Sequence, residues 1–142
     1  MKIKHEISAG GIVFKKTKDR VLWLTTQHSQ HKGWTFPKGL IADHHTDESM
    51  ADAALREVEE EGGIKARIIK PNTVEVKYIY RWENYLVKKT VHYFLMEYIS
   101  GDPNDHDWEV SEAKFMTEEE IIKTLTFKSD KEAFEKILMI FK

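Results

Sequence analysis

The chain has 142 residues, of which 41% are hydrophobic and 32% are charged, and its formal net charge at pH 7 is −2. These values predict a single soluble globular domain over residues 1–142 and exclude a disordered chain. The negative net charge argues against a nucleic-acid partner, so a phosphate-rich ligand has to be held by local lysines or by metal ions.

The chain contains no cysteine, which excludes disulfide bonds, thiolate metal ligands and a thiol nucleophile. Its apolar runs are only a few residues long, too short to span a membrane. The opening segment MKIKHEISAGG lacks the apolar core of a secretory signal. We therefore expect a cytoplasmic protein without a membrane partner. The sequence does not fix the oligomeric state, and a monomer is compatible with it.

In chain order, the first expected elements are two strands at 5–16 and 20–26, joined by a short turn. Residues 28–39 form an expected loop, because Pro37 and Gly39 interrupt any regular pattern there.

A helix is expected from about Glu48 to Glu61. Thr46 or Asp47 is the predicted N-cap, since both side chains can accept a backbone N–H. The glycine pair at 62–63 is the predicted stop.

Further strands are expected at 73–82, 87–98 and 109–116. Alternation places Tyr78 and Tyr80 on the same face of the first of them.

Two helices are expected to close the chain. One begins near Thr117, and the other covers 129–141 behind a cap at Ser129 or Asp130. Strands before and after one central helix, with further helices at the end, indicate an α/β fold in which a mixed β-sheet lies between helices.

The central helix carries an unusual concentration of negative charge in the segment REVEEEGG. At about 100° per residue, Glu57, Glu60 and Glu61 lie together along one edge of the apolar face. Carboxylates crowded in this way repel one another, and their hard oxygens suit Mg²⁺, Mn²⁺ or Ca²⁺. The alternative is an exposed acidic helix in which Arg56 neutralises Glu60 one turn on. Spacing alone does not decide between them.

A longer pattern does decide. Glu48 precedes Arg56 by seven intervening residues, and the string from Arg56 to Ile64 is REVEEEGGI. This arrangement resembles the signature of the Nudix hydrolases, which cleave a nucleoside diphosphate linked to another group. From Glu48 onward, every specified position of the signature matches. The resemblance implies an α/β/α sandwich along nearly the whole chain.

The same resemblance implies roles for the matching residues. It makes Glu57, Glu60 and Glu61 ligands of Mg²⁺, with Mn²⁺ as an alternative. Arg56 orients the carboxylates and Glu48 tethers the loop to the helix. The family's glycine commonly adds a carbonyl ligand. Gly39 is the match, but eight residues separate it from Glu48 where the family has five, so its role is left open.

A general base is also required for hydrolysis. The segment DWEVSEAKF resembles a later family segment in which a glutamate precedes an aromatic residue by six positions. Glu109 and Phe115 have that spacing, which makes Glu109 the candidate base or an additional metal ligand. Glu112 is the alternative.

Two further segments, WTFPKG and KTVHYFLMEY, resemble the Nudix subgroup that cleaves diadenosine tetraphosphate asymmetrically to ATP and AMP. The resemblance suggests Lys38 and Lys89 as phosphate ligands. Aromatic rings can stack a base, and the candidates for contacts with adenine or polyphosphate are Tyr78, Tyr80, His92 and Tyr93. Alternating aromatic residues on a strand more often belong to a packed core than to a stacking platform.

Other functions stay open at this point. The FPKG segment also occurs in decapping enzymes and diphosphoinositol phosphatases, and removal of damaged nucleoside triphosphates is a further alternative. Decapping requires a strongly basic RNA-binding region, which the net charge argues against. A nucleotide-sensing Nudix module without catalysis is the non-enzymatic alternative. The loop histidines His28, His31, His44 and His45 are candidates for phosphate contacts or, less well supported, a transition metal.

Overall fold

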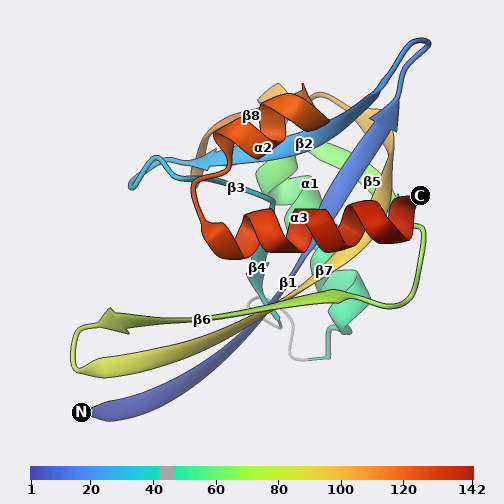
Figure 1. Ribbon diagram of the computed structural model, residues 1–142. Helices are drawn as coiled ribbons and strands as arrows, with labels where there is room; N and C mark the ends of the chain where they lie inside the picture. Colours follow the sequence, from blue (N-terminus) through green and yellow to red (C-terminus); the bar gives the residue numbers. More distant parts are fainter. Residues whose placement is uncertain (42–46) are drawn as a thin grey trace.

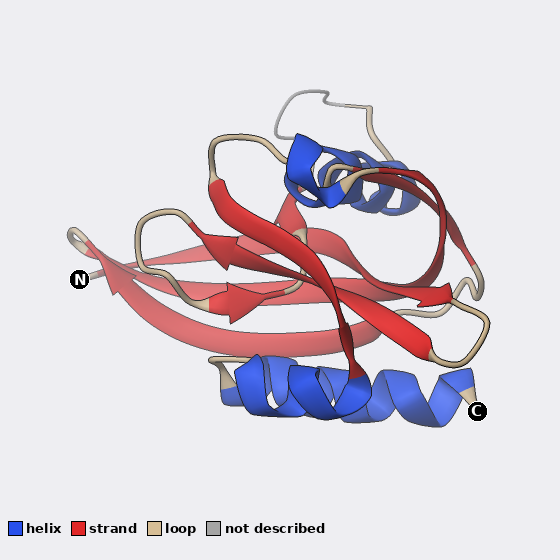
Figure 2. Ribbon diagram, turned by 90° about the horizontal axis from the view of Figure 1, so that it is seen from above, coloured by secondary structure: helices blue, strands red, loops and turns tan. Residues whose placement is uncertain are grey.

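The computed structural model describes residues 1–41 and 47–142. Within these residues the core is an eight-stranded mixed sheet with helices on both faces (Figures 1 and 2). The strands are β1 (Lys2–Lys16), β2 (Val21–His28), β3 (Trp34–Thr35), β4 (Lys38–Leu40), β5 (Ile64–Ile68), β6 (Val74–Trp82), β7 (Tyr85–Gly101) and β8 (Val110–Thr117). The helices are α1 (Met50–Gly62), α2 (Glu118–Thr124) and α3 (Lys128–Phe141), with a short 3-10 helix, η1, at Pro103–Asp105.

The sheet is held together by its two long strands. β1 and β7 run parallel, from the Lys2–Tyr85 pair to the Phe14–Glu97 pair. The remaining strands pair with them or with β2 in antiparallel fashion. The order along the sheet is β3-β2-β1-β7-β5, with β4 beside β1, β6 beside β7 and β8 beside β2. The expected α/β/α sandwich with a mixed sheet is confirmed.

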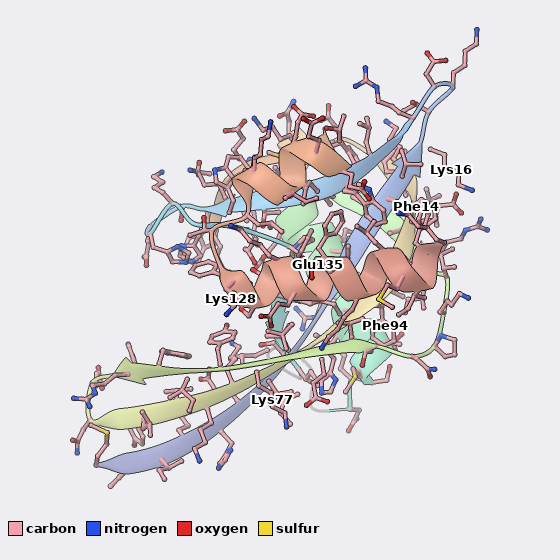
Figure 3. All side chains as sticks on the ribbon, viewed as in Figure 1. Phe14, Lys16, Lys77, Phe94, Lys128 and Glu135 are labelled. Atoms are coloured by element: carbon pink, nitrogen blue, oxygen red, sulfur yellow. The ribbon has the colours of Figure 1, made fainter. Side chains whose placement is uncertain are left out.

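Each face of the sheet buries its own hydrophobic cluster, because successive strand residues point to opposite sides. Phe14 belongs to the cluster that includes α2 and α3, and its ring lies 4.8 Å from that of Phe141. Phe94 belongs to the cluster under α1 (Figure 3). Long strands buried on both faces contain nearly continuous apolar runs, as in the centre of β1.

The first part of β1, the last part of β6 and the first part of β7 extend together away from the helices as an arm (Figure 1). One face of this arm continues the sheet face that carries α3. The arm therefore forms a wall beside the N-terminal end of α3, whose first residue is Lys128 (Figure 3).

Several expected boundaries are confirmed. Gly63 ends α1 with a left-handed φ of 75°, and its N–H donates to the Glu59 carbonyl oxygen. Thr117 caps α2 in a reciprocal capping box with Glu120.

Other boundaries were wrong. The cap of α1 is Ser49, whose Oγ accepts the Asp52 N–H at 3.1 Å, whereas Asp47 lies two residues too early and Thr46 lies outside the described residues. α3 begins one residue before the expected Ser129, and Asp130 is inside it and buried.

Three strands, β3, β4 and β5, were not expected. β3 and β4 contain two and three residues, too few to show an alternating pattern, and they form because longer strands provide a pairing edge. β5 has five residues, and the alternation of apolar and charged side chains in IKARI was the signal that could have predicted it. Among the described residues, no helix is both long and apolar enough to cross a membrane.

Candidate active site

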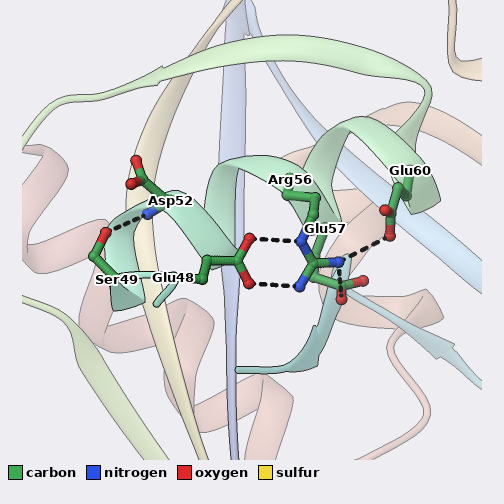
Figure 4. A network of polar contacts seen from close by, with 6 residues as sticks. All are labelled: Glu48, Ser49, Asp52, Arg56, Glu57 and Glu60. Carbon is green, nitrogen blue, oxygen red and sulfur yellow. Dashed lines mark hydrogen bonds and ion pairs between the residues drawn. The ribbon is translucent and has the colours of Figure 1, made fainter. Parts of the chain in front are cut away.

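The segment before α1 is fixed by Arg56. Its Nε and Nη2 donate to the two carboxylate oxygens of Glu48 at 2.7 and 2.9 Å, in the paired geometry that suits guanidinium and carboxylate (Figure 4). Its Nη1 donates to Glu57 at 2.9 Å and to Glu60 at 3.1 Å. These hydrogen bonds, led by those to Glu48, raise the pKa of Arg56. Arg56 therefore joins the segment before the helix to two of its acidic side chains.

Glu57 is the most buried acidic side chain of α1, with only 5% of the residue exposed. Its carboxylate lies against the backbone of Gly39, so closely that a Cβ at that position would stand 2.1 Å from Oε2. Only glycine allows this approach. Burial raises the pKa of Glu57 to about 7; Arg56 opposes the rise, and Glu60 and Glu109 add to it.

Glu61 lies one turn further along α1. Its Oε1 accepts the backbone N–H of Lys38 at 3.3 Å. Burial raises the pKa of Glu61 to about 8; Lys38 opposes the rise, while the charges of Glu57 and Glu109 add to it. Glu57 and Glu109 therefore lie close enough to Glu61 for their charges to disfavour its ionised form.

Glu109 comes from the loop before β8 and is exposed. It lines the same cleft as Glu61, and its charge acts on both Glu57 and Glu61. Its rival Glu112 pairs with Lys114 at 3.4 Å and lies outside the cleft lining that the described residues form. We call the group formed by Glu57, Glu60, Glu61 and Glu109 the acidic edge.

The donor set of the acidic edge fits a hard divalent cation, since carboxylate oxygens are the ligands such ions prefer. Two of its pKa values are raised by burial and mutual repulsion, which a cation would relieve. Within residues 1–41 and 47–142, however, no three acidic or histidine side chains already surround one point at coordination distance. Arg56 and the Lys38 N–H hold several of these oxygens, so binding requires the carboxylates to exchange these partners for the ion.

A cleft of about 1200 Å³ opens beside the acidic edge. Gly39, Glu61 and Glu109 line it at this side. The remainder of its lining comes from the arm, from the 28–38 segment and from the start of α3, and includes Lys38, Lys89, Tyr78, Tyr80, Trp82, His28, His31, Phe127 and Asp130.

Two lysines bring positive charge into the cleft. Lys38 Nζ donates to the Thr35 hydroxyl at 2.9 Å. Lys89 Nζ lies 3.6 Å from Glu6, and burial lowers the pKa of Lys89, an effect that Glu6 opposes and Lys38 increases. Ser8, fully buried on the same sheet face, also lines the cleft, and its Oγ has no hydrogen-bond partner among the described residues.

The predicted aromatic contacts divide into two groups. Tyr78 and Tyr80 line the cleft, with ring centroids 6.2 Å apart, and Tyr80 donates to Glu6 at 2.8 Å. Tyr93 is fully buried against Phe36, so the prediction that it contacts substrate was wrong.

His92 is a second correction. It precedes Tyr93 on β7 and therefore points to the opposite sheet face, where its Nδ1 is within 3.2 Å of Thr73 Oγ1. It is absent from the described lining of the cleft. Strand β7 is covered on both faces, so only alternate residues near its start can reach the cleft.

His28 and His31 do lie in the cleft wall, where their rings stack with centroids 4.1 Å apart. Burial lowers the pKa of both, and the charge of Lys38 lowers it further. With the other described residues they form no metal-binding group. His44 and His45 lie outside the described residues.

Sequence reasoning missed Ser8, Thr35, Trp82, Phe127 and Asp130 as cleft residues. Thr35 lies within the WTFPKG segment already connected with substrate, so that segment was the available signal. Asp130 looked like a helix cap, and no sequence pattern distinguished it from one.

The fold is thus an α/β/α sandwich whose acidic helix borders a cleft lined by lysines and tyrosines. The family model for the NUDIX domain matches residues 4–137, so the chain belongs to the Nudix family.

Comparison with curated proteins gives the same family. The chain is 29% identical to a protein designated MutT4 of Mycobacterium tuberculosis (strain CDC 1551 / Oshkosh), a match that covers 95% of this chain and 55% of that protein. It is 30% identical to Nudix hydrolase 6 of Arabidopsis thaliana over 83% of this chain and 41% of that protein. The chain thus spans about half the length of these relatives.

Solved structures share the fold. A binary complex of the C. elegans Ap4A hydrolase superposes with a TM-score of 0.81 at 23% identity, covering 96% of this chain and 97% of that one. The NUDIX domain of Shewanella oneidensis NrtR, complexed with ADP ribose, gives a TM-score of 0.72 at 17% identity over 97% and 89% of the two chains. At these identities the likeness concerns the fold alone.

Proposed function

We propose that this Nudix domain hydrolyses a nucleoside polyphosphate in a divalent-metal-dependent reaction, and that its substrate is diadenosine tetraphosphate, cleaved asymmetrically to ATP and AMP. The observation that carries the proposal is the joining of carboxylates, lysines and tyrosines in one cleft of about 1200 Å³. Ligand pockets usually measure roughly 300–1,000 Å³, so the cleft is large enough for a substrate with two nucleosides and four phosphates.

The proposed chemistry uses the acidic edge at one side of the cleft. Glu57, Glu60 and Glu61, with the Gly39 carbonyl as a further candidate, would hold a divalent ion there, and the ion would supply neutralisation of phosphate charge and a lower pKa for the attacking water. Glu109 accepts the proton of the attacking water. The water oxygen bonds to the phosphorus next to one adenosine, and the bond from that phosphorus to the bridging oxygen of the triphosphate breaks. AMP and ATP leave.

The rest of the cleft holds the substrate in place. Lys38 and Lys89 contact phosphate oxygens, and Tyr78 or Tyr80 stacks an adenine. These two tyrosines lie on the face of β6 that borders the lysines, since Tyr78 pairs with Lys89 across the sheet. This order of side chains fits a substrate whose polyphosphate lies between the lysines and whose adenine stacks on a tyrosine.

Product analysis tests the proposal. Protein with Mg²⁺ is incubated separately with diadenosine tetraphosphate, dGTP and a diphosphoinositol phosphate. We expect ATP and AMP from the first and little product from the others. In water labelled with ¹⁸O, the label should enter AMP. Cleavage of dGTP or the inositol derivative instead would contradict the substrate while preserving the hydrolase.

Glu57→Gln separates catalysis from folding. It keeps the side-chain shape but weakens a metal ligand, so we expect kcat/KM to fall by at least about 100-fold with the protein still folded. Glu59→Gln, on the exposed side of the same helix, is the matched control and should retain activity. Magnesium binding without cleavage of any substrate by the wild type would instead favour a nucleotide-sensing module.

A further inference from the structure

We propose that Asp130 and Thr35 form a positioning relay that fixes the ammonium group of Lys38 in the cleft, where it can contact a phosphate. The relay connects α3, at the far end of the sequence, with the loop that borders the acidic edge. It rests on the proposed function in one respect, namely that Lys38 contacts a phosphate of the substrate.

The relay is a chain of hydrogen bonds centred on a buried carboxylate. Asp130 is only 4% exposed. Its Oδ2 accepts the Thr35 hydroxyl at 2.5 Å and its Oδ1 accepts the Tyr93 hydroxyl at 3.0 Å. Thr35 Oγ1 in turn accepts from Lys38 Nζ at 2.9 Å.

The direction of these bonds follows from the chemistry of the groups. An ionised carboxylate can only accept, so the single hydroxyl proton of Thr35 is committed to Asp130. The lone pairs of Thr35 Oγ1 can then accept a hydrogen bond, and the Lys38 ammonium group donates it. Asp130 thereby determines which way the Thr35 hydroxyl points and what it can hold.

Lys38 is consequently fixed at both ends. Its backbone N–H donates to Glu61 Oε1 at 3.3 Å, and its Nζ is held by Thr35. A free lysine side chain loses much rotamer freedom when it binds a phosphate, whereas a lysine already held loses less. The relay therefore lowers the entropic cost of binding by holding Lys38 in place.

Asp130 also docks α3 on the sheet, because Thr35 is in β3 and Tyr93 is in β7. A purely structural role would make its two hydroxyl partners equivalent. They differ in their further contacts, since Thr35 also holds Lys38, whereas Tyr93 is fully enclosed in the core, where its hydroxyl interacts with Thr35 as well as with Asp130. This difference allows the two roles to be separated.

The test compares Thr35→Val with Tyr93→Phe, measured as KM and kcat for diadenosine tetraphosphate and as Tm. Each variant removes one hydroxyl donor to Asp130, but only Thr35→Val also releases Lys38. We expect both to lower Tm. Thr35→Val should raise KM by about 3- to 10-fold with kcat changed less than about 2-fold, whereas Tyr93→Phe should keep wild-type kinetics. Thr35→Ser, which retains the hydroxyl, should restore the wild-type KM.

Asp130→Asn should reproduce the KM of Thr35→Val if it folds, because an amide nitrogen opposes the hydroxyl donors. Equal kinetic constants for Thr35→Val and Tyr93→Phe would overturn the relay.

A binding measurement keeps the relay distinguishable from the proposed reaction. If the wild type cleaves no substrate, titration calorimetry with inorganic tripolyphosphate replaces kinetics, and the same 3- to 10-fold weakening is expected for Thr35→Val alone. Equal affinities for the two variants would overturn the relay while the wild type still binds. A wild type that neither cleaves nor binds would overturn both the relay and the proposed function.

Discussion

Ser8 illustrates how a single side chain can indicate a ligand. The residue is fully buried and lines the cleft, and its Oγ lacks a hydrogen-bond partner among the described residues. An unpaired buried hydroxyl costs free energy, so its retention beside two cleft lysines is consistent with a phosphate oxygen or water as its partner in the bound state.

Ser8→Ala should therefore change stability and affinity in opposite directions. Removing an unpaired hydroxyl should leave the free energy of unfolding of the free protein unchanged or slightly higher. Losing one neutral hydrogen bond should weaken polyphosphate binding by roughly 2- to 10-fold. Chemical denaturation and titration with tripolyphosphate measure the two effects. A clear loss of stability without loss of affinity would show that Ser8 serves only the fold.

The residue scale also shows how much the local sequence predicts. Glu57, Glu60, Glu61, Arg56 and Glu48 were named from spacing and resemblance, and the structure brings them together because they lie on one helix or just before it. Their metal-binding and catalytic roles stay predictions. The burial of Glu57 beneath Gly39 was not foreseeable, since it depends on a strand that pairs with β1.

At the scale of elements, α1 and the segment before it act as one unit. Glu48 lies outside the helix, whose cap is Ser49, yet Arg56 connects it to the acidic side chains two turns away (Figure 4). Only 15% of the Arg56 side chain and 6% of the Glu48 side chain are exposed, so this pair is poorly screened by water.

Arg56→Ala should destabilise the metal-free protein strongly. It leaves Glu48 and Glu57 without their cation, and we expect a loss of roughly 2–4 kcal/mol in the free energy of unfolding, reduced from the fully buried case by the remaining exposure. Arg56→Lys should recover only part of this, since an ammonium group cannot bind a carboxylate through two parallel bonds. Urea denaturation measures both.

Glu60→Gln is the matched control, because it removes one bond to Arg56 from a side chain that is 37% exposed. It should cost less than about 1 kcal/mol. A similar cost for Glu60→Gln and Arg56→Ala would contradict the view that Glu48 is the principal partner.

The helices and strands also show how far sequence periodicity predicts element boundaries. The long strands and α1 were predicted because apolar alternation or helical spacing extends over many residues. α3 was placed one residue late and its expected cap was wrong, because an aspartate at a helix start has the same local appearance whether it caps the helix or turns into the core. Its partners, Thr35 and Tyr93, lie 95 and 37 residues away in sequence.

At the scale of the whole molecule, burial of the acidic edge should make stability depend on pH. Folding raises the pKa of Glu57 to about 7 and of Glu61 to about 8, from an ordinary value of 4.5. The native state then binds these protons more tightly than the unfolded state. Their contribution to stability is fully present below about pH 4.5 and is lost as pH rises through 7 to 8.

We therefore expect the Tm of the metal-free protein to carry a component that falls between about pH 5 and pH 8.5. Glu61→Gln should flatten this component, whereas the exposed Glu59→Gln should not. Mg²⁺ should raise Tm more at pH 8 than at pH 5, because an ion that binds only the native state stabilises it and needs ionised carboxylates. Scanning calorimetry with EDTA or Mg²⁺ measures these changes. A magnesium shift that persists at full size in Glu57→Gln would contradict the assigned site.

The sequence by itself determined the fold class, the long strands, the acidic helix and the family, because these depend on patterns within contiguous segments. It also named cleft residues that follow a local motif, such as Lys38 and Glu109. The tertiary structure decided which alternating side chains reach the cleft: Tyr78 and Tyr80 do, while Tyr93 enters the core and His92 faces the other side. It also brought Ser8, Thr35 and Asp130 to one place. Their proximity arises from strand pairing and helix docking between distant segments, which no local pattern encodes.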